Sequence, residues 1–180
     1  MAQSSFWWIL LIGAVYGVLH SALASNRVKN LAARMFGRVF SRHYRLFFTL
    51  SASLSTLAYF GAILLFPDQS LYRIRPPWLY LTLITQLVAG VCFIAALFQN
   101  SLLGFSGLAS LFPNRPSRAE RLTTGGFYRY TRHPLYLFAL IMLWLLPVMT
   151  WNILALAIGV TVYTLIGSLL EERRLARQFG

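Results

Sequence analysis

The sequence predicts an all-α, polytopic integral membrane protein with about five transmembrane helices in a single structural domain. Of its 180 residues, 58% are hydrophobic and only 11% are charged, and the mean hydropathy is +0.63. A soluble domain of this size has too little interior to bury so much apolar surface. The apolar residues also fall into separate runs with the basic residues gathered between them, as in membrane spans joined by short connections.

Five apolar runs define the expected spans, and they are, in order, Phe6–Ala24, Leu46–Phe66, Trp78–Phe98, Leu135–Val148 and Ile153–Leu170. The first three have about 19–21 residues each, enough to cross roughly 30 Å of hydrocarbon at about 1.5 Å per residue. The fourth is shorter, so we expect the last two runs to form a short C-terminal helical hairpin or a span shielded by its neighbours. The first run lacks a basic region before it and a small-residue cleavage pattern after it, so we expect a retained helix rather than a signal peptide.

The charge pattern predicts an orientation in the membrane. Sixteen Lys and Arg residues against four acids give a net charge of +12. Because the basic residues lie in short stretches between apolar runs, we expect a lipid bilayer with anionic headgroups as the partner and no nucleic acid. Only Arg73 and Arg75 fall in the second connection. The other basic residues share one side of the membrane, and they are Arg27, Lys29, Arg34, Arg38, Arg42, Arg45, Arg115, Arg118, Arg121, Arg129, Arg132, Arg173, Arg174 and Arg177. The N-terminus is therefore expected outside.

The stretch TTGGFYRYTRHPLY precedes the fourth run and is the first candidate site. Gly125–Gly126 permits a tight turn or a close backbone approach to a ligand. Pro134 suits the first turn of a helix, which makes His133 a cap-like residue beside free helix N–H groups. Such a helix end attracts carboxylate or phosphate, and Arg129 and Arg132 strengthen the attraction. The alternative interpretation is interfacial anchoring, because Tyr and Arg are ordinary residues at headgroup depth.

Glu171 and Glu172 are half of the acids in the chain and lie where the last apolar run leaves the bilayer. Ion pairs along the helix surface, such as Glu171 with Arg174, would contribute only about 0.3–0.5 kcal/mol. The functional alternative is a carboxylate that binds a cation, a ribose hydroxyl or an amine of a ligand. Both interpretations remain open at this point.

His20 lies on an otherwise apolar run, about one turn from its end. An ionisable group inside a membrane span is by default a functional-site hypothesis. A structural hydrogen bond to another helix is the alternative, and a third is haem ligation by His20 with His133 or His43. The single cysteine, Cys92, lies in an apolar run, so we expect no disulfide framework, no cysteine-based cluster and no metal site.

Two motifs in order, RHPLY (Arg132–Tyr136) and EERRLARQFG (Glu171–Gly180), flank the expected hairpin. In this arrangement the stretch Leu122–Gly180 resembles the catalytic half of the isoprenylcysteine carboxyl methyltransferase superfamily. Those proteins are small integral-membrane enzymes that use S-adenosylmethionine. HSALASNRVK in the first run is similar to a bacterial branch that includes methanethiol S-methyltransferases and NnrU-like proteins. The resemblance implies residues 1–121 as an N-terminal half of three membrane helices with basic connections, and 122–180 as the catalytic, cofactor-binding half.

The resemblance also implies the roles of individual residues. It implies three catalytic residues, which are Arg132, Glu171 and Glu172. It implies a cofactor-binding set formed by Gly125, Gly126, Phe127, Tyr128, Arg129, Tyr130, His133, Pro134, Leu135, Tyr136 and Glu171, with His20 as a further candidate. The expected activity is methyl transfer from S-adenosylmethionine to a small or lipophilic acceptor, with thiol S-methylation favoured over prenylcysteine carboxyl O-methylation. The site is expected to face the cytoplasm from a bacterial inner membrane, and the alternative is an NnrU-like haem-binding or accessory membrane protein.

The sequence departs from the family pattern in three places. Phe138 stands where many members have Gly, and we expect it to narrow a lateral entrance from the bilayer. Gly167, Ser168 and Leu169 occupy the turn before the glutamate pair, where many members have Arg. Relatives continue past the matching Phe-Gly with a tyrosine-rich segment that helps cover the cofactor, whereas the given sequence stops at Gly180.

Overall fold

The structure, a computed structural model, describes residues 2–99 and 125–179. Its elements are, in chain order, α1 (Ala2–Ala24), α2 (Asn26–Leu65), β1 (Ser70–Arg73), α3 (Trp78–Gln99), the 3₁₀ turn η2 (Gly126–Arg129), α5 (Pro134–Trp144), β2 (Val148–Thr150) and α6 (Trp151–Phe179). The predicted class, an all-α membrane protein, is confirmed. Within the described residues, four helical stretches are long and apolar enough to span a bilayer, and they are Ser5–Ala24, His43–Leu65, Trp78–Gln99 and Trp151–Arg173.

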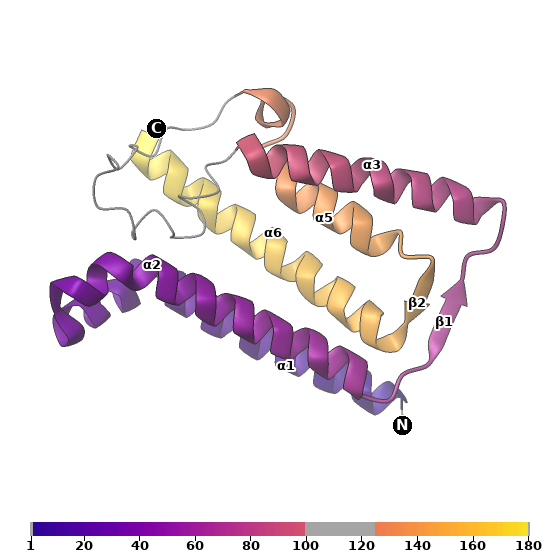
Figure 1. Cartoon of the computed structure of the whole chain (residues 1–180), viewed down its shortest axis with the longest axis horizontal. Coiled ribbons are helices and arrows are strands. Elements are labelled where there is room, and N and C mark those ends of the chain that lie inside the picture. Colours follow the sequence, from indigo (N-terminus) through magenta and orange to yellow (C-terminus); the bar gives the residue numbers. More distant parts are fainter. Residues whose placement is uncertain (1, 100–124, 180) are drawn as a thin grey trace.

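The fourth predicted span is the one that differs from expectation. Helix α5 has 11 residues, and about 16 Å of helix is too short to cross the hydrocarbon core alone. The chain continues from Leu145 in an extended path to Thr150 and reaches the end of the bundle where α2 and α3 are joined (Figure 1). The first arm of the predicted hairpin is therefore part helix and part extended chain.

Extended backbone has no hydrogen-bond partners within its own segment, so it has to find them elsewhere in the protein. Strand β2 finds them in β1, with Tyr72 opposite Met149 and Arg73 opposite Val148 in an antiparallel pair. The amide of Ile74 donates to the carbonyl of Pro147 at 2.8 Å and extends the pairing by one bond. The hydropathy pattern did not predict this two-stranded sheet, because an apolar strand of three residues looks the same as the end of an apolar helix.

Asn152 joins the ends of two helices beside the sheet. Its side chain is fully buried, and its Nδ2 donates to the carbonyls of Ile63 and Phe66, each at 3.2 Å. The Asp68 carboxylate accepts from the backbone amides of Gln69 and Asn152, at 2.8 and 3.2 Å. These bonds satisfy backbone groups at the end of α2 and the start of α6, which have no partner within their own helix.

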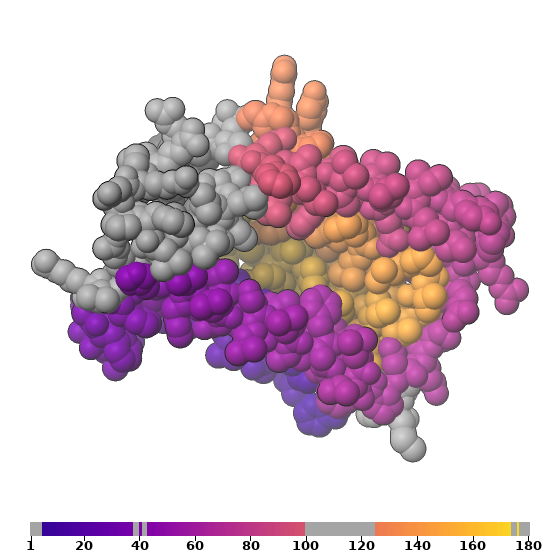
Figure 2. Space-filling model, in the orientation of Figure 1, coloured from indigo at the N-terminus to yellow at the C-terminus, as the bar shows by residue number. Residues whose placement is uncertain are grey.

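Helix α6 lies between two helix pairs, with α1 and α2 on one side and α3 and α5 on the other (Figure 1). The buried core joins α1, α2 and α6, and its members are Ile9, Tyr59, Ile63, Ala155 and Leu156. Gly13 lets α1 and α2 approach, because a Cβ there would lie 2.6 Å from the Tyr59 hydroxyl oxygen. On the face shown in Figure 2 the surface is hollowed between α2 and α3, and atoms of α5 and α6 form its floor.

Most large apolar side chains point away from this core. Leu64 and Leu65 are 85% and 86% exposed in the isolated chain, as expected of side chains that face lipid. Helix α2 changes direction at Gly37, whose φ of 77° and ψ of −173° are not helical. Two earlier expectations fall outside the described residues. They are the boundary between residues 121 and 122, and the basic residues Arg115, Arg118 and Arg121.

Candidate functional site

The site begins at the first residue before α5. His133 is the N-cap of this helix and Pro134 is its first residue, buried and at a position that needs no N–H donor. The amide of Leu137 donates to the His133 carbonyl at 3.1 Å. The cap-like role predicted for His133 is therefore confirmed. The N–H groups of Leu135 and Tyr136 have no intrahelical acceptor at this end, so they give the site a local positive potential.

The glycine pair forms the turn that leads to this helix. Gly126 has a φ of 62°, a left-handed conformation that glycine adopts without a steric penalty. The amide of Phe127 donates to Oε1 of Gln99 at 3.2 Å, which fixes the turn to the end of α3. A Cβ on Gly126 would lie 2.5 Å from Nε2 of Gln99. Close packing of the turn against α3 thus requires glycine at this position, and the predicted tight turn is confirmed.

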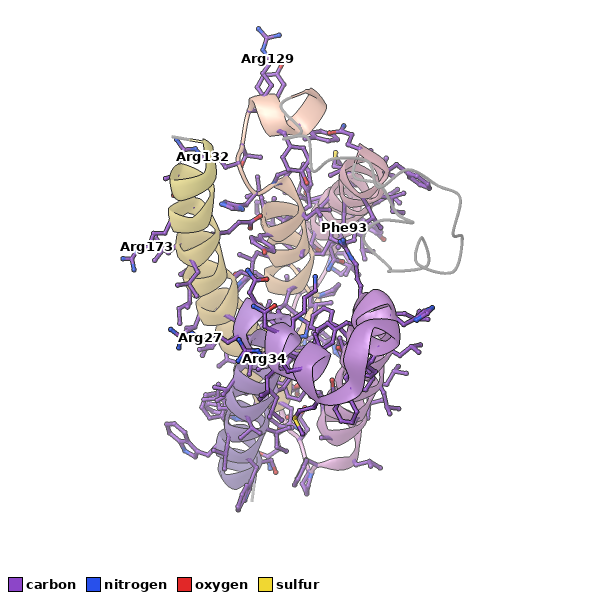
Figure 3. The ribbon with its side chains drawn as sticks, turned by 90° about the vertical axis from the view of Figure 1, so that its left-hand side faces the viewer. Arg27, Arg34, Phe93, Arg129, Arg132 and Arg173 are labelled. Atoms are coloured by element: carbon purple, nitrogen blue, oxygen red, sulfur yellow. The ribbon has the colours of Figure 1, made fainter. Side chains whose placement is uncertain are left out.

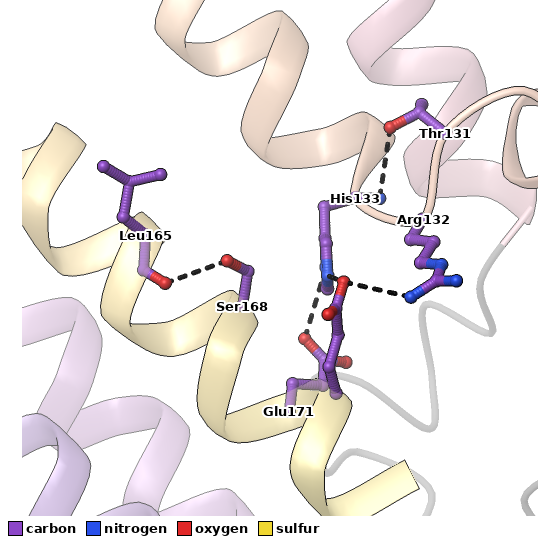
Figure 4. A network of polar contacts seen from close by, with 7 residues as sticks. Thr131, Arg132, His133, Leu165, Ser168 and Glu171 are labelled. Atoms are coloured by element: carbon purple, nitrogen blue, oxygen red, sulfur yellow. Dashed lines mark hydrogen bonds and ion pairs between the residues drawn. The ribbon is translucent and has the colours of Figure 1, made fainter. Parts of the chain in front are cut away.

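The two sequence motifs meet in space at one end of the bundle (Figure 4). Nδ1 of His133 lies 3.6 Å from Oε2 of Glu171, and Nε2 of His133 lies 3.5 Å from Oε1 of Glu172. The same Glu172 oxygen lies 3.6 Å from a guanidinium nitrogen of Arg132. Helix α6 therefore presents both carboxylates to the N-terminal end of α5. The Arg174 side chain, the alternative partner expected for Glu171, lies outside the described part of the structure.

These contacts are loose for groups of opposite charge. Charge-assisted N–H···O bonds are normally about 2.7–2.9 Å long, and each of the three pairs is longer than that. Nε2 of His133 is buried and forms no hydrogen bond with the residues described. The Glu171 side chain is 50% exposed. The cluster is therefore not closed on itself, and both carboxylates keep lone pairs for a ligand amine or hydroxyl.

Tyr136 places an aromatic ring next to the charged groups. Its ring stacks on the His133 imidazole, with centroids 5.4 Å apart and planes inclined by 12°. Burial raises the pKa of the Tyr136 phenol, and the nearby Glu171 carboxylate raises it further. Aromatic faces attract cations, so an aromatic wall beside two carboxylates suits a positively charged ligand.

Some of the expected site residues lie at the charged cluster, and others lie apart from it. Arg129 projects away from the helices, whereas Arg132 lies beside the end of α6 (Figure 3). Tyr130 is 86% exposed, and Gly125 is an exposed residue at the start of the turn. Phe127 packs edge-to-face on Phe138, with centroids 5.2 Å apart. The ring of Phe138 thus packs against the turn.

His20 lies among aromatic rings from three helices. Its imidazole is 5.6 Å from the ring centre of Tyr16 on α1, 5.0 Å from that of Phe48 on α2 and 6.2 Å from that of Tyr163 on α6. Sequence reasoning missed Tyr163 and Gln99 as site residues. Tyr163 lies about two turns before Glu171 in an apolar span, and its contact with His20 depends on the packing of α1 against α6.

Comparison with known proteins places the chain in a family. The phospholipid methyltransferase family matches residues 84–180. The chain is 31% identical over 175 residues to methanethiol S-methyltransferase 1 of Bradyrhizobium diazoefficiens, an alignment that covers 95% of this chain and 60% of the relative. It is 33% identical over 79 residues to the methanethiol S-methyltransferase of Crocosphaera subtropica, over 44% of this chain and 31% of the relative. It is 38% identical over 73 residues to the methanethiol S-methyltransferase of Pseudomonas deceptionensis, an alignment that covers 41% of this chain and 28% of the relative.

The chain thus spans 60% of the length of the first of these relatives and less of the other two. No solved structure matches it. The family match includes the end of α3 and every later element that the structure describes, and it covers more than half of the chain. The membrane methyltransferase resemblance carried by the two motifs is therefore confirmed, and the chain belongs to the phospholipid methyltransferase family.

Proposed function

We propose that this protein transfers a methyl group from S-adenosylmethionine to a small thiol at the membrane. The observation that carries the proposal is the contact between His133 at the start of α5 and the pair Glu171 and Glu172 on α6. This contact joins the two motifs into one polar cluster, and its groups are only partly satisfied by one another.

The residues present fit the charged and polar groups of the methyl donor. Arg132 and the free N–H groups at the start of α5 suit the carboxylate of its methionyl part. Glu171 suits the amino group or the ribose hydroxyls, and the face of Tyr136 suits the sulfonium. When bound, S-adenosylmethionine supplies an electrophilic methyl group on a sulfonium sulfur.

The residues of the chain align the reactants and exclude water from them. Methyl transfer is an in-line displacement at carbon, so alignment of the nucleophile supplies much of the rate enhancement. The ring of Tyr136 lies against His133, and the ring of Phe48 lies against His20. Apolar surface of this kind keeps water from a nucleophile. Arg132 favours the thiolate form of an acceptor, although its side chain is 81% exposed and its field is screened.

A thiol acceptor is proposed because the three relatives reported above are named methanethiol S-methyltransferases. Small apolar thiols partition into a bilayer and can reach a site whose outer walls face lipid. Prenylcysteine carboxylates and phospholipids are the competing acceptor classes. The charge distribution supports an N-terminus outside and a site that opens to the cytoplasm of a bacterial inner membrane.

Two measurements on the purified protein test this proposal. Calorimetry is expected to detect binding of S-adenosylmethionine, and His133→Ala is expected to weaken it strongly because both carboxylates then lose their partner. A radiolabelled methyl-transfer assay over alkanethiols, prenylcysteines and phospholipids is expected to label the thiols. Absence of donor binding by a protein that unfolds cooperatively would contradict the proposed activity. Labelling of phospholipids alone would contradict the proposed acceptor.

A further inference from the structure

The site described so far accounts for a bound donor and contains no assigned group for the proton of a thiol. The thiolate is the nucleophile, so a neutral thiol must lose its proton before or during attack. His133 has carboxylates facing both of its ring nitrogens. Arg132, as a permanent cation, has no lone pair with which to take a proton. A proton acceptor outside this cluster leaves its groups free to hold the donor.

His20 has the environment expected of such a group. It lies on α1, one turn before the helix ends at Ala24, and its imidazole is only partly buried. Its Nδ1 is enclosed and forms no hydrogen bond with the residues described. The rings that surround it are aromatic, and they come from α1, α2 and α6. A structural histidine would normally satisfy its buried nitrogen, and a purely apolar position would be filled better by Leu or Phe.

Helix α6 connects His20 to the donor side. The imidazole of His20 meets the edge of Tyr163 on α6, with planes inclined by 81°. The Tyr163 hydroxyl is held on the α1 side by Ser21, whose Oγ donates to it at 3.4 Å. About two turns further along α6, Glu171 and Glu172 face the ring nitrogens of His133. The same helix therefore carries the ring that contacts His20 and the carboxylates of the donor side.

Tyr163 lies close enough to α1 for the contact to hold its ring beside His20. A Cβ on Gly17 would lie 3.0 Å from Cδ2 of Tyr163. The glycine therefore allows the tyrosine ring to lie against α1 beside His20. This packing places the Tyr163 ring, which is 37% exposed, between α1 and the surface of α6.

We infer that His20 is the proton acceptor of the reaction and that the aromatic cluster around it, formed by Tyr16, Phe48 and Tyr163, is the acceptor pocket. This inference rests on the proposed function. In the step, the thiol S–H bond breaks and its proton moves to a ring nitrogen of His20. The thiol sulfur forms a bond to the methyl carbon, and the bond from that carbon to the donor sulfonium breaks with its electron pair. The neutral thiol and cationic donor become two neutral thioethers, and the positive charge resides on the imidazolium.

The test compares two acceptors that differ in whether their proton needs to be removed. Ethanethiol is mainly protonated near neutral pH, and nitrothiophenol is mainly ionised. His20→Ala is expected to lower the rate with ethanethiol about 100-fold, the lower range for general-base catalysis. With nitrothiophenol the loss is expected to stay below about tenfold, because its thiolate already exists. Donor affinity measured by calorimetry is expected to match that of the unmodified protein.

Controls separate proton transfer from packing. Phe48→Leu removes a ring contact with His20 and keeps the base, so its loss is expected to be the same factor for both acceptors. His20→Gln keeps a hydrogen-bonding side chain without a basic nitrogen, and it is expected to show the same acceptor-dependent loss as His20→Ala. Equal losses with both thiols in the two His20 variants, or no loss, would overturn the inference. So would loss of donor binding in both. Failure of the unmodified protein to bind the donor is a different result, which contradicts the proposed function itself.

Discussion

Glu171→Gln separates ligand binding from folding and is the most direct test of the carboxylate pair. The substitution keeps the size of the side chain and removes its charge. In the structure Glu171 is paired with Nδ1 of His133 at 3.6 Å, and its side chain is 50% exposed. A half-exposed ion pair of this length contributes about 0.5 kcal/mol or less to the free energy of unfolding. For a chain of 180 residues that corresponds to a shift in Tm of only about 1–2 °C.

The effect on ligand binding is expected to be much larger. A hydrogen bond from a ligand amine or hydroxyl to a carboxylate contributes about 1.5–3 kcal/mol. Loss of that contribution weakens binding about 10- to 150-fold. Calorimetric titration of the detergent-solubilised protein with S-adenosylmethionine measures this factor, and thermal unfolding of the same sample measures Tm. The expected signature is a large loss of affinity at an almost unchanged Tm.

Asp68→Asn is the matched control, because it makes the same chemical change at the opposite end of the bundle. Asp68 accepts hydrogen bonds from the backbone amides of Gln69 and Asn152 at the start of α6. Asn keeps the acceptor oxygen and loses the charge, which contributes about 0.3–1 kcal/mol at the start of a helix. Asp68→Asn is therefore expected to lower Tm by about 1–4 °C and to leave donor affinity unchanged. If Glu171→Gln keeps its affinity within about twofold, or Asp68→Asn weakens donor binding as much as Glu171→Gln does, the assignment of Glu171 to the ligand is wrong.

Other outcomes follow from single features of the structure. Asn152→Ala leaves two buried helix-end carbonyls without their donor and is expected to cost about 2–4 kcal/mol, seen as a lower Tm with unchanged donor affinity. Gly126→Ala forces a left-handed φ on alanine and a contact with Gln99, and calorimetry is expected to show donor binding weakened several-fold. In intact cells, Ser70→Cys is expected to react with a membrane-impermeant maleimide and Arg173→Cys is not, and the reverse pattern would contradict the orientation. The purified protein is expected to show no Soret band, whereas a band lost in a histidine variant would support the haem alternative.

The residue pattern predicted the membrane class and much of the local structure at the site. Run length and hydropathy located the full spans, because lipid imposes a length on a helix that a sequence displays directly. Pro134 predicted the start of α5 and Gly126 predicted the turn, since both residues restrict or permit particular backbone angles. The two-stranded sheet was missed because its partners come from separate connections, and their pairing depends on the path of the whole chain.

The contacts within the charged cluster could not be predicted from the local sequence. From the residues alone, His133 was an interfacial anchor or a ligand group, and Glu171 was a surface ion-pair partner or a ligand group. The structure brings the two within 3.6 Å of each other, which spacing in the sequence alone could not show. Arg129 shows the opposite case, because its closeness to the motif suggested a role and its side chain projects away from the helices (Figure 3).

The position of the glutamate pair depends on structure at the far end of the bundle. A residue on a helix turns by about 100° for each step along the chain, so the face that Glu171 presents is set by where α6 begins. That start is fixed by the pairing of β2 with β1 and by the buried side chain of Asn152. From there α6 runs through the apolar core to the charged end without an interruption. The sheet and the buried amide therefore orient two carboxylates across the full length of the helix, and this link fixes the geometry of a site whose residues come from distant parts of the chain.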